Sequence, residues 1–341
     1  METEILKVTE ENLNEAAKKA AGVLLGGGII GLPTETVYGL AANAYNADAV
    51  RRIFRAKGRP QDNPLIVHVN DFVMLRDVAE VSAQAVELAK TFWPGPLTLV
   101  MPKKPVIDPV VNCGLPTVAV RMPSHPIAQA VITAADVPVA APSANLSGRP
   151  STTTAQHVAD DLKGKIPLIL DGGNCEIGVE STVVSLVGKN PVILRPGIIS
   201  IEMIRGVYPK TEYSEAVFKG MPEAEKAESP GMKYKHYSPR AEVVVVKSTL
   251  GQFVDYVSAR AGDGVCAMCF DGEQDEILIP SVSYGKKGDG FSQAKRLFTV
   301  LRMMDKLGSV RVFVRAPDET NESMAVFNRL IQASGFRVVE L

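Results

Sequence analysis

Apolar residues in the first two hundred positions form short β-branched runs that alternate with longer segments carrying one apolar face. Short apolar runs are typical of buried strands, and apolar residues every three or four positions are typical of amphipathic helices. The predicted strands are residues 29–32, 65–69, 97–101, 118–121, 137–141, 168–171, 182–187 and 192–194. The predicted helices are residues 12–25, 47–56, 82–92, 126–135 and 154–162. Because a purely parallel sheet needs a crossover for each strand, this excess of strands predicts an α/β domain with a twisted mixed sheet.

The periodicity disappears between residues 208 and 240 and then returns. Residues 212–229 are charged and short of apolar side chains, which is typical of a mobile tether. Strands and helices then alternate strictly, with strands at 243–246, 265–270, 310–315 and 336–341 and helices at 250–261, 292–307 and 319–334. This pattern predicts a small three-layer, Rossmann-like α/β domain with a mainly parallel sheet. We therefore expect domains at 1–209 and 242–341, joined by a linker at 210–241.

Composition is that of a soluble globular protein. Hydrophobic residues make up 46% and charged residues 22% of the 341 positions, and they are mixed along the chain, which excludes long disorder. Lys and Arg number 37 against 38 Asp and Glu, so the overall charge argues against a general nucleic-acid binder. The N-terminus lacks a basic segment followed by an apolar run, and no eighteen-residue apolar stretch occurs, so we expect a cytoplasmic protein.

The four cysteines, Cys113, Cys175, Cys266 and Cys269, are too few and too unevenly spaced for the disulfide framework of a secreted protein. The CAMC string at 266–269 has redox or half-zinc spacing, but it lies in an apolar run without a second Cys/His pair. We expect a plain buried strand there.

Two nucleotide-binding signatures are missing or misplaced. The string GGGIIG at 26–31 matches the dinucleotide pattern GxGxxG, but it precedes a strand instead of following one. The sequence has no GxxxxGK[ST] phosphate loop. A nucleotide would therefore be held by side chains and irregular loops.

A basic segment is the first candidate for that task. Five cations fall within residues 51–59, near a helix end for which Gly58 is the predicted cap. A solvated basic face that complements the helix C-terminus is the simpler explanation. The string KGRPQDNP at 57–64, however, places two cations beside a loop fixed by two prolines, which could hold them against a triphosphate.

Two predicted strands open into small and polar residues, PTETVYG at 33–39 and PSANLSG at 142–148. Ligands gather beyond strand ends in open α/β sheets, although each string alone could be a simple turn.

The chain resembles the YrdC-like family, because a set of short strings occurs in the order found there. Besides the two strings above, the set comprises KGRP at 57–60, PLIVH at 64–68, WPGPLT at 93–98, VRMP at 120–123, ESTV at 180–183 and RPG at 195–197. The string SPGMKYKHYSP at 229–239 resembles the linker signature of its two-domain members. Lys233 and Lys235 stand where the family often has Arg, and Glu35 where it often has Asp.

The resemblance implies an adenylate-forming nucleotidyltransferase. Members of the YrdC-like family that it resembles convert L-threonine, bicarbonate and ATP into threonylcarbamoyl-AMP and pyrophosphate, the first step of threonylcarbamoyl-adenosine synthesis in tRNA. We expect magnesium to be held mainly through the ATP phosphates, because no carboxylate cluster has ligand spacing. We expect the product to pass to a tRNA threonylcarbamoyl transferase, without stable tRNA binding by this chain.

The resemblance also implies roles for individual residues, with Lys57 and Arg59 as the catalytic cations. The threonine pocket would be lined by Thr36, His68, Arg121, Ala141 and Ser181. ATP would be held by Lys57, Arg59, Asn63, Thr117, Ser143, Asn145, Ser151, Arg195, Tyr234 and His236. Without the resemblance, His68 would be interpreted as a core histidine.

The Pro-bounded stretch 230–239 is richer in aromatic residues than a spacer needs, and we expect it to fold over the nucleotide pocket as a lid. The alternative to a lid is an inert connection between the domains.

Two other functions fit parts of the sequence. A double-stranded RNA-binding module would use the cations of 51–59, but the balanced charge and the lack of interleaved aromatics disfavour it. A carbamoyl-transferring maturation enzyme would be expected to carry cysteine-rich metal modules, which this sequence lacks.

Overall fold

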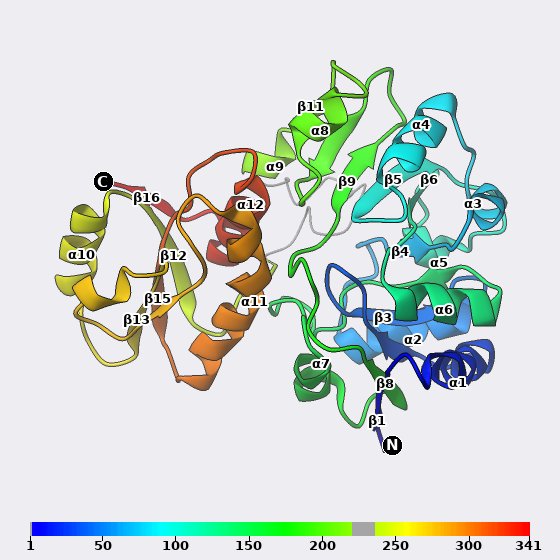
Figure 1. Ribbon diagram of the computed structural model, residues 1–341, viewed down its shortest axis with the longest axis horizontal. Helices are drawn as coiled ribbons and strands as arrows, with labels where there is room; N and C mark the ends of the chain where they lie inside the picture. The colour runs from blue at the N-terminus through cyan, green and yellow to red at the C-terminus, as the bar shows by residue number, and fades with distance from the viewer. Residues whose placement is uncertain (1, 220–235) are drawn as a thin grey trace.

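The computed structural model describes residues 2–219 and 236–341, which fold around two β-sheets (Figure 1). In this part of the chain the first sheet has the order β1-β8-β2-β3-β7-β4-β6-β5-β9-β10-β11. Its strands are β1 (Glu4–Lys7), β2 (Ile30–Leu32), β3 (Gly39–Asn43), β4 (Ile66–His68), β5 (Leu97–Pro102), β6 (Thr117–Arg121), β7 (Val139–Ala140), β8 (Leu168–Asp171), β9 (Thr182–Ser185), β10 (Val192–Arg195) and β11 (Glu212–Tyr213). Parallel and antiparallel pairs both occur, which confirms the predicted mixed sheet.

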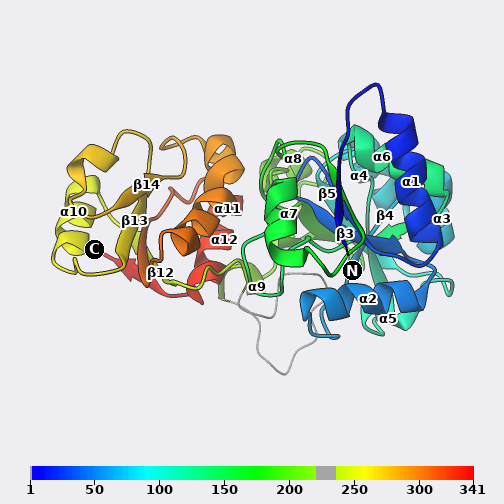
Figure 2. The same cartoon turned by 90° about the horizontal axis from the view of Figure 1, so that it is seen from below.

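Helices flank this sheet and bury their apolar faces against it (Figure 2). They are α1 (Leu13–Leu25), α2 (Ala47–Lys57), α3 (Phe72–Val78), α4 (Ala83–Phe92), α5 (Pro109–Asn112), α6 (Pro126–Ala135), α7 (Ala155–Leu162), α8 (Ile201–Arg205) and α9 (Ala216–Lys219). The two ends of helix α2 carry capping residues that mark its limits in the sequence. The Asn46 side chain accepts from the Ala49 amide at its start, and Gly58 ends it with a φ of 61°. That abrupt end directs Lys57 and Arg59 toward the strand ends.

Several elements of this domain were not predicted, among them β1, β3 and the helices α3, α5 and α8. Strand β1 was missed because it is short and largely exposed, and β3 was missed because GLAAN lacks β-branched residues. The predicted tether is ordered at its start, where β11 joins the sheet and α9 follows it. Tyr213 and Phe218 pack edge to face there, with ring centroids 5.6 Å apart, and Val217 is buried. These few apolar side chains are hidden in the average composition of residues 212–229.

The second sheet has the order β14-β13-β15-β12-β16, and each of its pairings is parallel, as predicted. Its strands are β12 (Glu242–Lys247), β13 (Val265–Cys269), β14 (Ser281–Ser283), β15 (Arg311–Arg315) and β16 (Val338–Glu340). Its helices are α10 (Leu250–Ser258), α11 (Gly290–Lys306), α12 (Met324–Ser334) and the short 3-10 helix η1 (Gln274–Glu276). Helix α10 covers the outer face, and α11 and α12 lie between the sheet and the first domain (Figures 1 and 2). This is the expected three-layer domain.

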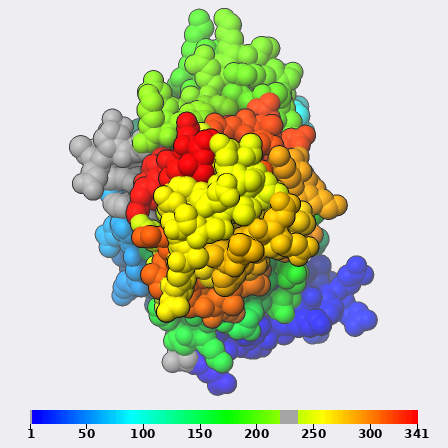
Figure 3. All heavy atoms as spheres, turned by 90° about the vertical axis from the view of Figure 1, so that its left-hand side faces the viewer, coloured from blue at the N-terminus to red at the C-terminus, as the bar shows by residue number. Residues whose placement is uncertain are grey.

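The second domain packs closely onto the first. Its core includes Val37, Ile177 and Val179 of the first domain, together with residues of α11 and α12. Seen from the side of the second domain, its yellow to red segments lie in front of the green and blue segments of the first domain (Figure 3). The domain limits 1–209 and 242–341 stay a prediction.

Cys266 and Cys269 lie buried on β13, and both are free thiols, as the plain-strand interpretation requires. Within residues 2–219 and 236–341, no helix is both long enough and apolar enough to span a membrane.

Candidate functional site

A pocket opens at the strand ends of the first sheet and encloses about 700 Å³ of empty space, including solvent at its mouth. Strand β4 brings His68 to it, β6 brings Arg121 and β10 brings Arg195. The full lining is Thr34, Thr36, Val37, Gly39, Lys57, Arg59, Ile66, His68, Arg121, Ala141, Pro142, Ser143, Asn145, Ser147, Gly148, Arg149, Glu180, Ser181, Arg195, His236 and Tyr237. Five of these side chains are Lys or Arg and one is an acid, so the lining suits an anion.

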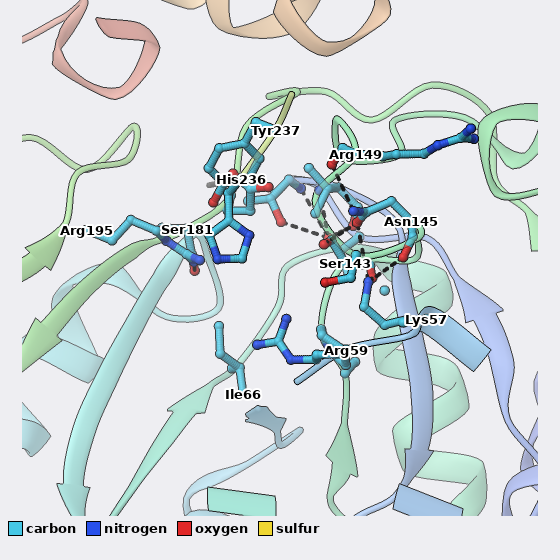
Figure 4. Close-up of a pocket in the computed structure, with 18 of the residues that line it drawn as sticks. Lys57, Arg59, Ile66, Ser143, Asn145, Arg149, Ser181, Arg195, His236 and Tyr237 are labelled. Carbon is cyan, nitrogen blue, oxygen red and sulfur yellow. Dashed lines mark hydrogen bonds between the residues drawn. The ribbon is translucent and has the colours of Figure 1, made fainter. Parts of the chain in front are cut away.

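Lys57 lies at the end of α2 under the loop that follows β7 (Figure 4). Its Nζ donates to the Ser143 carbonyl, to the Asn145 carbonyl at 2.6 Å and to Asn145 Oδ1 at 3.5 Å. Only 2% of the residue is exposed, so Lys57 is buried in the pocket wall. Burial, and then the charge of Arg59, lower the pKa of Lys57 well below its ordinary value. Through these three hydrogen bonds, Lys57 holds the loop after β7, which forms one wall of the pocket.

Arg59 follows on the proline-fixed loop and is held by carbonyl groups. Its Nε donates to the Asn63 carbonyl at 3.1 Å, and its Nη2 donates to the Pro64 carbonyl at 2.9 Å. Burial lowers the pKa of Arg59 to about 10, so the guanidinium still carries its charge at neutral pH. Both contacts use the backbone, and no ion pair between Arg59 and a carboxylate occurs among the described residues, although the charge of Asp62 acts on Arg59 more weakly.

Arg121 forms a buried ion pair that the sequence did not predict. Its Nη2 lies 2.5 Å from Glu35 Oε1, its Nη1 donates to Thr36 Oγ1 at 2.8 Å, and its Nε donates to the Gly95 carbonyl at 3.2 Å. Burial raises the pKa of Glu35, but the charge and hydrogen bond of Arg121, together with backbone hydrogen bonds, outweigh burial and lower it overall. The strand end at Glu35 is thus fixed to the end of β6.

His68, Ala141 and Ser181 also line the pocket, and His68 lies opposite Arg121 in the pairing of β4 with β6. Burial, and then the charge of Arg121, lower the pKa of His68 to about 3, so its imidazole is neutral at physiological pH. Ser181 Oγ lies 2.8 Å from Thr98 Oγ1 and accepts from Arg195 Nη2 at 3.1 Å. These groups offer a compact set of neutral donors and acceptors beside one paired cation.

The loop after β7 forms the facing wall. Ser143 Oγ donates to Asn145 Oδ1 at 2.5 Å, and Asn145 Nδ2 donates to the carbonyls of Leu146 and Arg149 at 2.8 and 2.9 Å. Figure 4 shows Lys57 and this loop on one side of the pocket and Arg195, Ser181 and His236 on the other.

Two aromatic residues of the predicted linker, His236 and Tyr237, complete the lining. Tyr237 is buried with a φ of 63°, which a non-glycine residue adopts only where its surroundings enforce it. Its ring lies 5.2 Å from Phe298 and 5.6 Å from His236, measured between centroids. Burial, and then the charge of Arg59, lower the pKa of His236 to about 3. The predicted lid residues Tyr234, Lys233 and Lys235 lie outside the described residues.

Three predicted site residues do not line this pocket. Asn63 is buried behind Arg59, Thr117 starts β6 at the end opposite Arg121, and Ser151 Oγ donates to Glu180 below the surface. Their nucleotide contacts stay predictions. Conversely, Glu180 and Tyr237 line the pocket although neither was expected to contact threonine or ATP; both belong to the family strings at 180–183 and 229–239, and Tyr237 also to the predicted lid.

The lining fits a metal only if the metal arrives with a phosphate ligand. Among the described residues, Glu180 is the one carboxylate that lines the pocket. Both of its oxygens already accept hydrogen bonds, one from Ser151 Oγ and the other from Arg329 Nε. No cluster of three or more His, Cys, Asp or Glu that could hold a metal ion occurs in residues 2–219 and 236–341. Hydroxyl and amide oxygens of Ser143, Asn145 and Ser147 could still face a hydrated cation.

The fold and the pocket define a two-domain α/β protein with a cationic cavity for a small anionic ligand. A family model described as "Telomere recombination", covering Sua5, YciO and YrdC proteins, matches residues 22–197. A second model, described as the C-terminal domain of threonylcarbamoyl-AMP synthase, matches residues 199–335.

Curated relatives agree with these models. A threonylcarbamoyl-AMP synthase of Pyrococcus abyssi is 44% identical over 99% of this chain and 100% of its own length. A second, from Bacillus subtilis, is 42% identical over 94% of this chain and 93% of its own. The crystal structure of Pyrococcus abyssi Sua5 complexed with L-threonine superposes with a TM-score of 0.92 and 42% identity, over 99% of this chain and all of that one. The chain belongs to the threonylcarbamoyl-AMP synthase family, in its two-domain form.

The buried histidines predict that the protein loses stability in acid. His68, His236 and His157 have folded-state pKa values of about 3, 3 and 4, whereas an unfolded histidine has one near 6.5. Below about pH 6.5 the unfolded chain therefore binds protons that the folded chain does not, so the free energy of unfolding falls by up to about 1.4 kcal/mol per pH unit for each histidine.

Urea unfolding at about pH 7 and about pH 5 measures this slope. Replacing His157 by Gln, which keeps a polar side chain beside Thr153, should reduce the slope by about one proton. A free energy of unfolding that is the same at both pH values would contradict the prediction.

Proposed function

We propose that this protein makes L-threonylcarbamoyl-AMP and pyrophosphate from L-threonine, bicarbonate and ATP. The observation that carries the proposal is the match of the whole chain, at 42% identity and a TM-score of 0.92, to a Sua5 structure complexed with L-threonine. The pocket supports it, because its two halves suit an amino acid and a polyphosphate separately.

The threonine half is the one formed by Thr36, His68, Arg121, Ala141 and Ser181. Three N–H groups of Arg121 contact Glu35, Thr36 and Gly95, so two of its five remain for a carboxylate. The neutral His68 imidazole and the small Ala141 side chain leave room for the substrate's short side chain. We propose that Arg121 binds the threonine carboxylate and that Ser181 orients the amine or the carbamate formed on it.

The nucleotide half, as we define it, comprises Arg59, Ser143, Asn145, Arg195 and His236, which line both sides of the pocket seen in Figure 4. Arg59 offers a positive charge that forms no ion pair with a carboxylate among the described residues, which suits a phosphate contact. Lys57 holds the carbonyls of Ser143 and Asn145, so we propose that it positions this wall and adds its charge at close range. Asn63, Thr117, Ser151 and Tyr234 are retained as proposed nucleotide contacts on the family resemblance alone.

The reaction needs positioning and charge stabilisation more than a strong base. A threonine carbamate oxygen attacks the α-phosphorus of ATP, the bond to the β-phosphate oxygen breaks, and pyrophosphate leaves. We propose that Arg59 and Arg195, which both line the pocket, stabilise the charge that develops on the phosphate oxygens. The buried lining keeps water from the labile carbamate. A magnesium ion bound through the ATP phosphates would neutralise part of their charge.

The neutral overall charge, a net of −1, gives no support to RNA binding as the primary function. We propose a cytoplasmic location, where ATP, bicarbonate and free threonine are all present, and transfer of the product to a separate enzyme that acts on tRNA.

Pyrophosphate release from ATP tests the proposal. We expect release that needs both threonine and bicarbonate and that stops when magnesium is chelated, with the adenylate identified by mass spectrometry. Release without threonine, or none with the complete mixture, would refute the proposed reaction. Binding of a short RNA duplex at physiological salt, without release, would favour the RNA-binding alternative instead.

A further inference from the structure

The loop wall of the pocket is supported from behind by Asp161 of α7. The Leu146 amide donates to Asp161 Oδ2 at 3.1 Å, and Arg149 Nη1 donates to Asp161 Oδ1 at 2.9 Å. The Asp161 side chain is fully buried. Burial would raise its pKa, but the contacts with Arg302 outweigh burial and lower it. A charged carboxylate thus sits behind residues 145–151.

Arg302, on α11 of the second domain, completes this support. Its Nη2 donates to Asp161 Oδ2 at 2.8 Å and its Nη1 to Asp161 Oδ1 at 3.3 Å, in the two-pronged geometry of a guanidinium on a carboxylate. The same side chain donates to the Pro150 carbonyl at 2.6 Å through Nη2 and to the Ser151 carbonyl at 3.3 Å through Nε. One arginine therefore holds both the carboxylate and the backbone of the loop.

Arg329, on α12, grips the other side of the same region and is fully buried. Its Nε donates to Glu180 Oε2 at 2.8 Å, its Nη2 to the Glu180 carbonyl at 3.2 Å and its Nη1 to the Pro196 carbonyl at 2.8 Å. The other carboxylate oxygen of Glu180 accepts from Ser151 Oγ. The two arginines therefore meet at Ser151, where one binds its carbonyl and the other reaches its hydroxyl through Glu180.

We propose that Arg302 and Arg329 are positioning residues through which the second domain sets the geometry of the nucleotide half of the pocket. Neither lines the pocket, but each holds a segment that does, residues 145–149 in one case and Glu180 in the other. Buried ion pairs add little net stability because desolvation offsets their attraction, so stability alone does not explain two of them at one junction. What they supply is a fixed orientation. Close packing points the same way, since a Cβ on Gly178 would lie 2.5 Å from the Ala294 carbonyl of α11.

This inference rests on the proposed ATP-dependent reaction, and a binding measurement separates the two. We expect Arg302→Lys and Arg329→Lys, which keep a positive charge but lose the fork, to weaken binding of a non-hydrolysable ATP analogue about tenfold or more. The threonine KM should change less than about twofold, because Arg121 and Thr36 are held by other contacts. Titration calorimetry of the full-length variants and steady-state KM values for both substrates give these numbers.

Two variants are the matched controls. Arg296→Lys lies on the exposed face of α11, the helix that carries Arg302, and Arg337→Lys lies in an exposed pair with Glu242. Both should bind the ATP analogue like the parent protein. Parent-like analogue binding by Arg302→Lys and Arg329→Lys would overturn the inference, and so would equal losses for ATP and threonine, which indicate general destabilisation. If the parent binds the analogue but releases no pyrophosphate, the proposed reaction fails while positioning is still decided by the variants' binding. If a Lys variant does not fold, Asp161→Asn, which keeps the shape of the side chain that Arg302 holds, decides the outcome by the same two measurements.

Discussion

Replacing Lys57 by Met should reduce pyrophosphate formation about a hundredfold or more and should also destabilise the fold. Methionine keeps most of the volume of the buried stem but removes the three donors that now hold the carbonyls of Ser143 and Asn145 and the Asn145 side chain. Buried carbonyls left without donors cost about 1–3 kcal/mol each, so the loop that forms the nucleotide wall should loosen. A lost charge close to the phosphates adds to the effect on turnover.

The Arg55→Met variant is the control for Lys57→Met, because Arg55 lies in the same last turn of α2 but is exposed. Pyrophosphate release under saturating threonine and thermal unfolding should both be close to those of the parent in this control. Near-normal release by Lys57→Met would remove the proposed role of the ammonium group, even if the variant melts at a lower temperature.

Local signals explain which parts of the fold the sequence predicts. Helix α2 was predicted at residues 47–56 and runs from Ala47 to Lys57, because Asn46 and Gly58 mark its ends chemically. Strand β1 was missed because its partner is β8, with Glu4 opposite Leu168, and no local pattern reports such a distant pairing. The second domain was predicted well because strict alternation of strand and helix leaves few possible topologies.

The site divides in the same way. The cations at 57 and 59 and the polar strand ends could be predicted, since each lies in a compact local string of unusual residues. The partners of those residues could not be predicted. Glu35 is the ion partner of Arg121, 86 positions away, and Arg329 reaches Glu180 across 149 positions and a domain boundary. The burial of Lys57 could not be predicted either, because it depends on the loop after β7, whose carbonyls at Ser143 and Asn145 lie against its ammonium group.

The Arg121–Glu35 pair leads to two variants with opposite consequences. Arg121→Lys keeps a positive charge beside Glu35, so most of the stability should remain, but a lysine cannot reach Glu35, Thr36 and a substrate carboxylate together. The threonine KM should rise about tenfold or more, with little change in the ATP KM. Glu35→Gln removes the negative partner and leaves the Arg121 charge buried, which should cost about 3–5 kcal/mol in the free energy of unfolding.

Urea unfolding and the two KM values, measured on both variants, separate binding from stability. The control is Arg311→Lys, in an exposed pair with Glu242, which should change neither quantity because exposed ion pairs contribute about 0–1 kcal/mol. An unchanged threonine KM in Arg121→Lys would mean that the substrate carboxylate binds elsewhere. Parent-like stability in Glu35→Gln would mean that the hydrogen bonds from Arg121 to Thr36 and to the Gly95 carbonyl are enough to stabilise its buried charge. The substrate could then bind that charge without Glu35 as a fixed carboxylate partner.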